Sequence, residues 1–239
     1  MINDNSKPLI FIGSNYHLCF FTDACEMHGI KVHGIIDNDY YGNTAELDGV
    51  PFIDTEVSFD DPEKLEYYKN NFNFFLATNW VPTGIQPDIA VRNKQKRDRL
   101  ISIIEKYGLP CINLVDPTAR IHKSATLGKN IFIDANCYLA PKSSIGDFTN
   151  LFTGAGIGYN TKIGNSCVFQ RHSGTMNDMT IEDEVYFGLH AQAPKDGSLI
   201  RRGTVVHPCL MVLRDTQENE EISLVGKDLR RVYHLHQEA

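Results

Sequence analysis

From Val115 to Met211 the chain repeats with a period of six: every sixth residue is large and apolar, apart from Thr175 and Ala193. Counted at this fixed step, seventeen positions follow one another with no residue inserted or lost. A helix repeats its apolar face about every 3.6 residues and a strand about every two, so neither produces this period. Hexapeptide periodicity is typical of a parallel β-helix, in which each hexad supplies one short strand and one corner. The positions are Val115, Ile121, Leu127, Ile133, Leu139, Ile145, Leu151, Ile157, Ile163, Phe169, Thr175, Ile181, Phe187, Ala193, Leu199, Val205 and Met211.

A second position in each hexad, four residues after the first, is Ala, Gly, Ser, Cys, Thr or Val in fourteen of the seventeen repeats. Ile131, Met179 and Asp215 are the exceptions. Three hexads make one triangular coil, so seventeen hexads predict between five and six coils. We expect the large residues to fill the interior of this prism and the small ones to sit where its walls converge. Each coil then covers the apolar edge of the next, and stability accumulates through stacking.

Composition disfavours several classes of partner. A net charge of −7 and a pI near 5.7 argue against a nucleic-acid surface, whose usual footprint is a basic patch. No apolar run approaches the roughly 18 residues that span a bilayer. The start, Met1-Ile2-Asn3-Asp4, lacks the basic and apolar regions of a secretion signal. We therefore expect a cytoplasmic protein with no membrane insertion and no nucleic-acid partner.

The cysteines support the same compartment. Of the six, Cys137, Cys167 and Cys209 fall on the small inward positions of the prism. They are interpreted as reduced packing residues, not as a disulfide framework. No two cysteines have the spacing of a metal-ligand pair, so no metal is expected.

The first third of the chain opens with a βαβ pattern. An apolar run at residues 9–12 predicts a buried strand ending in Gly13, and a helical pattern follows from about 17 to 28. A second strand at 32–36 ends in Asp37-Asn38-Asp39, with Asp37 24 residues beyond Gly13. That spacing is close to the one at which a Rossmann-like domain places its ribose-binding acid. The alternative is a plain strand-turn-helix with an ordinary loop acid, because only the first glycine of the fingerprint is present.

Further elements alternate up to the prism. Short strands are expected at 49–53, 72–77 and 110–115, and helices at 62–70 and 92–107. The Lys and Arg run of the last helix is interpreted as a solvated face. After residue 216 we expect a strand at 222–225 and a short helix at 227–235. No low-complexity linker is present, so the domains are placed at 1–115, α/β, and 116–239, all-β.

At this point the chain resembles a known family, the nucleotide-sugar acyltransferases that include sialic-acid O-acetyltransferases and bacillosamine and perosamine N-acetyltransferases. The family's Gly-x-Gly-Gly-His-Gly loop corresponds to residues 13–18, where Gly13 and His17 match. Its acidic cluster corresponds to 37–39 and its His-Pro-Ser-Ala segment to 116–119. Its two closing segments correspond to 211–215 and 226–230.

The resemblance implies a fold and a reaction. The β-helix should be left-handed, the protein a homotrimer, and the active site should lie between adjacent prisms. The first domain should bind a nucleotide-linked amino sugar through Gly13, Ser14, His17, Asp37 and Asn38. Acetyl-CoA, as co-substrate, should lie along the prism, and the product would enter surface-glycan biosynthesis.

The family's catalytic motif is only partly present. Its Asn-Thr-Gly-Ala segment corresponds to residues 152–155, of which the last three match, but its general-base histidine is Tyr159 and the acidic partner is Asn160. A positioned base contributes roughly 10²–10⁴ in rate, and an unperturbed tyrosine, with a pKa of about 10, is a poor base near neutrality. A neutral amine can attack a thioester first and release its proton afterwards. We therefore expect substrate-assisted N-acylation in preference to O-acylation.

Other residues are candidates for the site. His172 and His190 are 18 residues apart and should stack on adjacent coils at about the 4.8 Å strand spacing. They are candidate catalytic or coenzyme-binding residues, or a solvated pair at a corner. CoA binding is predicted for six positions, the first four on the outer wall of the late coils and the last two reaching its phosphates: Gly188, Ala191, Pro208, Cys209, Lys227 and Arg230.

The sequence leaves one other function open and argues against a second. A catalytically silent nucleotide-sugar-binding or scaffold homologue would show the same loss of the catalytic histidine. A γ-type carbonic anhydrase needs three zinc-binding histidines, and no two of His122, His172, His190 and His207 share a coil closely enough. A zinc site is therefore not predicted.

Overall fold

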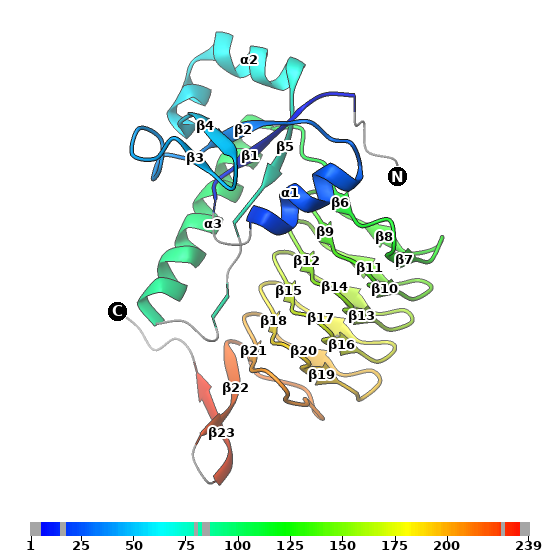
Figure 1. Cartoon of the computed structure of the whole chain (residues 1–239). Coiled ribbons are helices and arrows are strands. Elements are labelled where there is room, and N and C mark those ends of the chain that lie inside the picture. Colours follow the sequence, from blue (N-terminus) through cyan, green and yellow to red (C-terminus); the bar gives the residue numbers. More distant parts are fainter. Residues whose placement is uncertain (1–5, 15–17, 79–80, 83–86, 226–227, 235–239) are drawn as a thin grey trace. The chain divides into compact units, whose positions relative to one another are not determined.

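The computed structural model describes residues 6–14, 18–78, 81–82, 87–225 and 228–234 (Figure 1). The chain forms two compact units, one comprising Met1–Trp80 and Ile85–Leu114 and the other Val81–Gly84 and Val115–Ala239. Among the helices in these described ranges, none combines the length and apolar character that crossing a membrane requires.

The first unit is an α/β domain with a five-stranded sheet. Its strands are β1 (Leu9–Ile12), β2 (Val32–Ile36), β3 (Glu46–Leu47), β4 (Val50–Asp54) and β5 (Asn73–Leu76), in the order β3-β4-β2-β1-β5. Only β3 runs antiparallel, as a hairpin with β4. The interior strand β1 pairs with β2 and β5 and is fully buried. The helical elements are α1 (Leu18–Met27), the 3-10 helix η1 (Glu56–Asp60), α2 (Pro62–Asn71) and α3 (Pro87–Tyr107).

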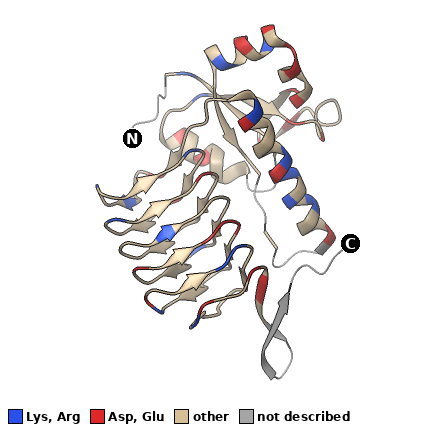
Figure 2. Ribbon diagram, turned by 180° about the vertical axis from the view of Figure 1, so that it is seen from behind, with Lys and Arg blue, Asp and Glu red and all other residues tan. Residues whose placement is uncertain are grey.

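The expected elements of this unit are present, with two corrections. In place of a strand at 110–115 there is a bridge from Cys111 to Phe74 and a two-residue strand, β6 (Leu114–Val115). The basic run of α3 was expected to be solvated, and this is wrong for part of it. Basic and acidic side chains follow one another along α3 (Figure 2). Arg97 is 3% exposed, and Lys96 is held by two carboxylates.

Apart from its last two strands, the second unit is a stack of two-residue strands in three parallel sheets (Figure 1). Through most of the stack each strand pairs with the one 18 residues later, as in Leu151 with Phe169 and Phe169 with Phe187. The predicted parallel β-helix of hexapeptide repeats is therefore confirmed. One sheet holds β7 (Arg120–Ile121), β10 (Tyr138–Leu139), β13 (Gly156–Ile157), β16 (Gly174–Thr175) and β19 (Gln192–Ala193). The second holds β8 (Thr126–Leu127), β11 (Ser144–Ile145), β14 (Lys162–Ile163), β17 (Thr180–Ile181) and β20 (Leu199–Ile200). The third holds β6, β9 (Phe132–Ile133), β12 (Asn150–Leu151), β15 (Val168–Phe169), β18 (Tyr186–Phe187), β21 (Val205–Val206) and the last two strands of the chain, β22 (Glu220–Val225) and β23 (Asp228–His234).

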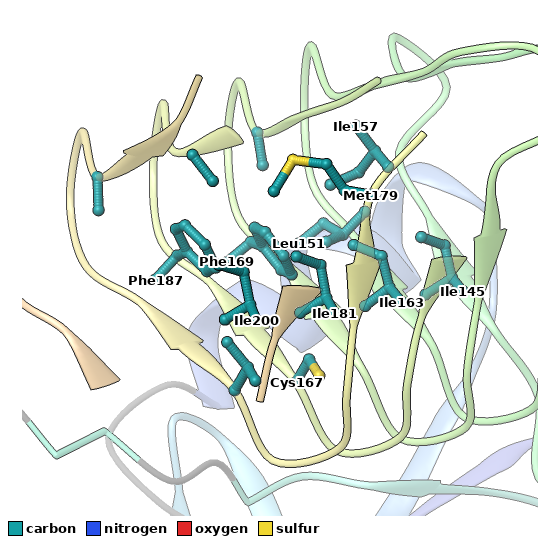
Figure 3. Packing of buried hydrophobic residues seen from close by; sticks show 14 of the residues in the cluster. Ile145, Leu151, Ile157, Ile163, Cys167, Phe169, Met179, Ile181, Phe187 and Ile200 are labelled. Carbon is teal, nitrogen blue, oxygen red and sulfur yellow. The ribbon is translucent and has the colours of Figure 1, made fainter. Parts of the chain in front are cut away.

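The interior of the prism is filled as the repeat predicts. The large residues stack in rows, one of which runs through Ile145, Ile163, Ile181 and Ile200 (Figure 3). The rings of Phe169 and Phe187 lie face to face with centroids 4.9 Å apart. The second, smaller positions are inside as well: Cys137, Ala155, Cys167, Val185 and Ala191 are at most 1% exposed. Burial raises the pKa of the Cys137 thiol to about 12, as expected for a reduced packing residue.

The corners of the coils repeat on the same period. Residues with left-handed backbone recur every six positions up to His190, and the next is Gly197, a step of seven. For most residues this conformation costs roughly 1–2 kcal/mol, whereas Gly, Asn and Asp adopt it more readily. The series comprises Asn130, Asn136, Lys142, Phe148, Gly154, Asn160, Ser166, His172, Asp178, Glu184, His190, Gly197, Gly203 and Cys209.

The step of seven corrects the predicted register of the last coils. Ile181 pairs with Ile200 and Phe187 with Val206, each 19 residues later, so the chain carries one extra residue. Thr175 still pairs with Ala193, and the carboxylate of Asp196 accepts the backbone N–H of Asn177, which places the extra residue at 194–195.

The predicted inward positions beyond Ala193 are therefore wrong. The interior residues are Ile200, Val206 and Val212, in place of Leu199, Val205 and Met211. Cys209, predicted to face inward, is an exposed corner residue for the same reason.

The chain ends in a hairpin. β22 continues the third sheet beside β21, and β23 returns antiparallel to it, so the predicted closing helix is wrong. Near the hairpin, the Arg214 guanidinium donates to both carboxylate oxygens of Glu220, a residue 1% exposed. The same carboxylate accepts the backbone N–H of Gln217, so a hydrogen bond within the acidic loop joins residues 217 and 220.

Candidate active site

One wall of the prism carries a bare strip of backbone. In each strand of the β7–β19 sheet the second residue points inward and the first outward. The outward row is Arg120, Tyr138, Gly156, Gly174 and Gln192, paired in that order. Two adjacent glycines at its centre contribute no side chains to the wall. Gly156 is open, whereas Gly174 is buried, and a Cβ there would be 3.2 Å from the side-chain Oε1 of Gln192.

The bare strip is the floor of a hollow of about 460 Å³. A Cβ at position 156 would find no atom within 4 Å, so the ring of Tyr138 does not fold over this glycine. Glycine weakens a strand interior, and where it occurs there it often marks the close approach of a ligand or of another backbone. The hollow is lined by Tyr138, Ala140, Pro141, Gly154, Gly156, Ile157, Gly158, Tyr159, His172, Ser173, Gly174, Thr175, Asn177 and Gln192.

Tyr159 lies at one corner of this hollow, next to Asn160 in the chain. The Lys142 ammonium is 5.3 Å from the centre of the Tyr159 ring, and interaction with that side chain raises the pKa of Lys142. Asn160 has left-handed backbone and donates its side-chain amide to Asp178 at 2.8 Å. Asn160 is thus held by its neighbour on the next coil, and Tyr159, 39% exposed, is the one of the pair that lines the hollow.

His172 lies at another corner of the same hollow. Its ring stacks on that of His190 with centroids 5.1 Å apart and planes 13° apart, which confirms the predicted ladder. On its other side the imidazole lies against Gly154, where an added Cβ would be 2.5 Å from Nδ1. Of the two histidines, only His172 lines the hollow. Tyr159 and His172 therefore share one site, and His190 lies behind it.

Several predicted CoA contacts are elsewhere. Ala191 was expected on the outer wall, and this is wrong, since its side chain is fully buried inside the prism. Gly188 is buried against Pro208, whose backbone nitrogen would be 2.7 Å from an added Cβ. Pro208 and Cys209 are exposed one coil beyond the hollow. Lys227 lies outside the described residues, and for Arg230 only its place in β23 is described.

In the first unit, the strand ends bring Gly13, Ser14 and Asp37 together. Gly13 has a φ of +70°, and a Cβ there would be 2.4 Å from the side chain of Leu100, so the turn requires glycine. The Asp37 carboxylate is fully buried: Ser14 Oγ and Lys96 Nζ each donate to Oδ2 at 2.8 Å, and the N–H of Asp39 donates to Oδ1. Asp37 therefore organises its neighbours, while Asp39 reaches the surface. His17 lies outside the described residues.

The predictions from sequence did not include the partners of this cluster. Lys96 bridges Asp37 and Asp39; burial lowers the pKa of Lys96, and its bonds to these carboxylates more than compensate, so the net direction is upward. Arg99, one turn further on α3, pairs with the buried Glu56 at 3.3 Å. Asn38 and Glu56 exchange backbone-to-side-chain bonds of 2.9 and 3.1 Å. The only hint in the sequence was the spacing of the basic residues on α3.

One carboxylate of this cluster, that of Glu56, has an oxygen without a hydrogen-bond partner in the described residues. Burial raises the pKa of Glu56, against the opposing effects of Arg99 and of the Asn38 N–H. Oε1 of Glu56 is buried without a hydrogen-bond partner in the described residues. Across the described ranges, no three His, Cys, Asp or Glu side chains are arranged to hold a metal ion.

Known proteins share this architecture. No protein-family model and no curated sequence matches the chain. Among solved structures, a point mutant of perosamine N-acetyltransferase from Caulobacter crescentus, in complex with CoA and GDP-perosamine, superposes with a TM-score of 0.76. It is 21% identical, over 90% of this chain and 92% of that one. WeeI from Acinetobacter baumannii AYE has a TM-score of 0.74 at 16% identity, over 95% of this chain and 100% of that one. The predicted resemblance is thus confirmed for the fold, across nearly the whole chain.

Proposed function

We propose that the protein is an acetyl-CoA-dependent N-acyltransferase that acts on a nucleotide-linked amino sugar for surface-glycan biosynthesis. The observation that carries this proposal is the hollow over Gly156 and Gly174, with Tyr159 and His172 at its corners. In this assignment the bare backbone admits the thioester, and the corner side chains face the reacting atoms. The superposition with an acetyltransferase that holds CoA and a nucleotide-linked amino sugar supports the assignment by analogy of fold.

The wall of the hollow suits an anionic coenzyme. Arg120 lies 5.9 Å from the Tyr138 ring centre and Lys142 lies near Tyr159, so two cations flank the bare strip. Cations beside an open groove are the usual partners of phosphate oxygens. These two residues replace Ala191 in the proposed set of CoA contacts.

The first unit is proposed as a Rossmann-like nucleotide site. Its parallel strands, numbered along the chain, have the order 3-2-1-4, which places a change of direction between β1 and β5. Ligands of open α/β sheets bind at the carboxyl ends of strands beside such a point. Gly13 and Ser14 follow β1 there, with Asn38 and Asp39 after β2. Because Asp37 is buried, we assign direct ligand contact to Asn38 and Asp39.

The assembly is proposed to be a homotrimer of left-handed prisms. A trimer of 27.0 kDa chains would have about three times that mass. Light scattering coupled to size exclusion tests this directly, and a monomer at micromolar concentration would exclude it.

Amine transfer fits the residues better than hydroxyl transfer. With a pKa near 8, about a tenth of an amine is neutral at pH 7, whereas an alcohol hardly ionises without a base. The position of the family's histidine carries Tyr159 here, so a hydroxyl, which must lose its proton as it attacks, has no strong base at that corner. An amine can attack first and release its proton afterwards to a base elsewhere in the hollow.

The test is turnover of acetyl-CoA with matched acceptors. UDP-, GDP- and dTDP-linked amino sugars are compared with the same sugars carrying a hydroxyl in place of the amine, and products are identified by mass spectrometry. We expect acetyl transfer to at least one amine and none to its hydroxyl counterpart. O-acetyl transfer without an N-acetyl product would overturn the preference for amines.

A second function is favoured by one observation. Asn160 is held by Asp178, and Tyr159 lies beside Lys142, as in a site kept for structure and not for chemistry. If the protein is a silent scaffold, calorimetry should detect binding of both acetyl-CoA and a nucleotide-linked amino sugar, and no acetyl transfer should occur.

A further inference from the structure

We propose that His172 accepts the proton in the acyl transfer, so that the base lies at a different corner from Tyr159. This inference rests on the proposed function and deepens it. It begins from the shared site: Tyr159 and His172 line the same hollow over the same glycine floor. A group entering along Gly156 and Gly174 can therefore face the imidazole.

The fold reserves space for this imidazole. In its column of corners, one coil apart, lie Asn136, Gly154, His172 and His190, all with φ between +56° and +72°. Because three of the four carry side chains at this φ, the backbone conformation does not by itself require glycine at 154. A Cβ at 154 would lie 2.5 Å from Nδ1 and 2.8 Å from Cε1 of His172. The ring of His172 occupies the volume that this glycine leaves.

Other contacts fix the histidine in place. Its ring is covered on the far side by His190, with the planes 13° apart. Its backbone carbonyl accepts a 2.8 Å hydrogen bond from the side chain of Gln192, another residue that lines the hollow. His172 is therefore held between Gly154 and His190 and by the hydrogen bond from Gln192, while remaining exposed to solvent. We assign His190 a positioning role.

The acyl transfer passes through a tetrahedral adduct. The neutral amine nitrogen attacks the thioester carbonyl carbon, forming a C–N bond and giving a tetrahedral adduct with a positively charged nitrogen. The imidazole of His172 takes the proton from that nitrogen. The C–S bond then breaks, the carbonyl re-forms, and the imidazolium returns the proton to the sulfur. The products are the acetamide and the free thiol of CoA, and the imidazole is regenerated.

The main variant is His172→Asn, because Asn136 shows that this column accepts asparagine in the same backbone conformation. We expect kcat to fall about 10²-fold, the low end of the 10²–10⁴ that a positioned base contributes, with KM for both substrates within threefold. The matched control is His190→Asn, the same change one coil on, which should lower kcat by less than about tenfold. His172→Gly should regain activity with added imidazole and not with pyrrole, which has the same shape and no basic nitrogen.

A second pair of variants tests position alone. Gly154→Ala and Gly197→Ala introduce a Cβ at φ of +72° and +69°, so both incur the same kind of steric penalty. At Gly197 the added Cβ meets nothing within 4 Å, whereas at Gly154 it displaces the imidazole. We expect kcat to fall at least about tenfold in Gly154→Ala, as for other misplaced catalytic groups, and to stay within twofold in Gly197→Ala.

The outcomes separate the two proposals. If the wild type transfers acetyl groups and the His172→Asn variant has the same kcat, His172 is not the proton acceptor, and the proposed acyltransferase function stands. Equal losses in His172→Asn and His190→Asn, without rescue by imidazole, mean a structural ladder and also overturn it. A wild-type protein that turns over none of the acceptors removes the transferase, and the role of His172 falls with it.

Discussion

At the scale of single residues, Gly156 and Gly158 are two positions apart and differ in what surrounds them. A Cβ at 158 would lie 2.0 Å from the backbone oxygen of Met176, so the close stacking of two coils requires glycine there. A Cβ at 156 would meet nothing within 4 Å, and neither glycine has the left-handed backbone that would demand it. Packing explains the glycine at 158, and we explain the glycine at 156 by ligand access.

Gly156→Ala should therefore stabilise the protein and impair the reaction. Glycine inside a strand costs roughly 0.5–1 kcal/mol relative to alanine, so the free energy of unfolding should rise by about that amount. The methyl group would narrow the floor of the hollow, and we expect KM for acetyl-CoA to rise about tenfold, equivalent to about 1.4 kcal/mol. Urea unfolding and steady-state kinetics measure the two effects.

Gly158→Ala is the matched control. Overpacking against backbone costs typically 1–3 kcal/mol, so this variant should lose stability by about that amount. A Gly156→Ala variant with unchanged kinetics would mean that no ligand approaches this strip.

At the scale of elements, the extra residue at 194–195 decides how the last coils pack. Before it, strands repeat every 18 residues; across it, Ile181 meets Ile200 at a step of 19. The extra residue lies in an exposed turn, where the backbone is solvated and no sheet partner must move. Insertions in surface turns are tolerated in this way because few packed groups depend on them.

Deleting Lys195 should therefore be tolerated. The deletion restores the regular coil and leaves Ile200, Val206 and Val212 facing inward, so we expect a melting temperature within about 4 °C of the wild type, at about 2–4 °C per kcal/mol for a chain of this size. Circular dichroism during heating measures it.

The matched control deletes Met176, which occupies the corresponding turn one coil earlier and is also exposed. There the deletion shortens a regular coil, and a one-residue slip turns side chains to the other face of a strand. We expect a fall of more than about 10 °C, or insoluble protein, on the same scale. Similar melting temperatures for the two deletion variants would mean that the extra residue does not decide the register of the last coils.

At the scale of the whole molecule, the two units have separate cores. The prism interior is built from residues of the second unit, from Val115 to Ile222. Among the described residues of the first unit, the sheet uses no strand after β5 and is extended by the bridge at Cys111. Each unit therefore has its own hydrogen-bonded sheet and its own apolar interior.

A fragment of residues 113–239 should fold and keep one of the two proposed ligands. Repeat stacks are stabilised by contacts between neighbouring coils, which this fragment retains. We expect a β-type circular dichroism spectrum, CoA binding within about threefold of the full chain, equivalent to about 0.7 kcal/mol, and no detectable binding of UDP, GDP or dTDP by calorimetry. Nucleotide binding by the fragment would contradict the placement of that site in the first unit.

Much of this architecture is determined by the sequence alone. Period six reports the stacking directly, because each inward residue lies against its equivalent one coil away, as Phe169 lies against Phe187. The same arithmetic brings His172 onto His190. The order of strands and helices in the first unit also follows from local patterns, such as the helical pattern at 62–70 that forms α2 (Pro62–Asn71).

Only the tertiary structure decides the register of the last coils and the pairing of distant side chains, because local sequence patterns fit more than one arrangement. Beyond Ala193, the series starting at Leu199 and the one starting at Ile200 are both apolar, and only pairing with Ile181 selects the second. The buried Asp37 finds Lys96 59 residues away, a pairing that no local rule specifies. Gly154 makes room for an imidazole 18 residues later, because stacking brings one coil against the next. Periodicity encodes which residues are inside, and contacts between distant segments decide what the outside residues can do.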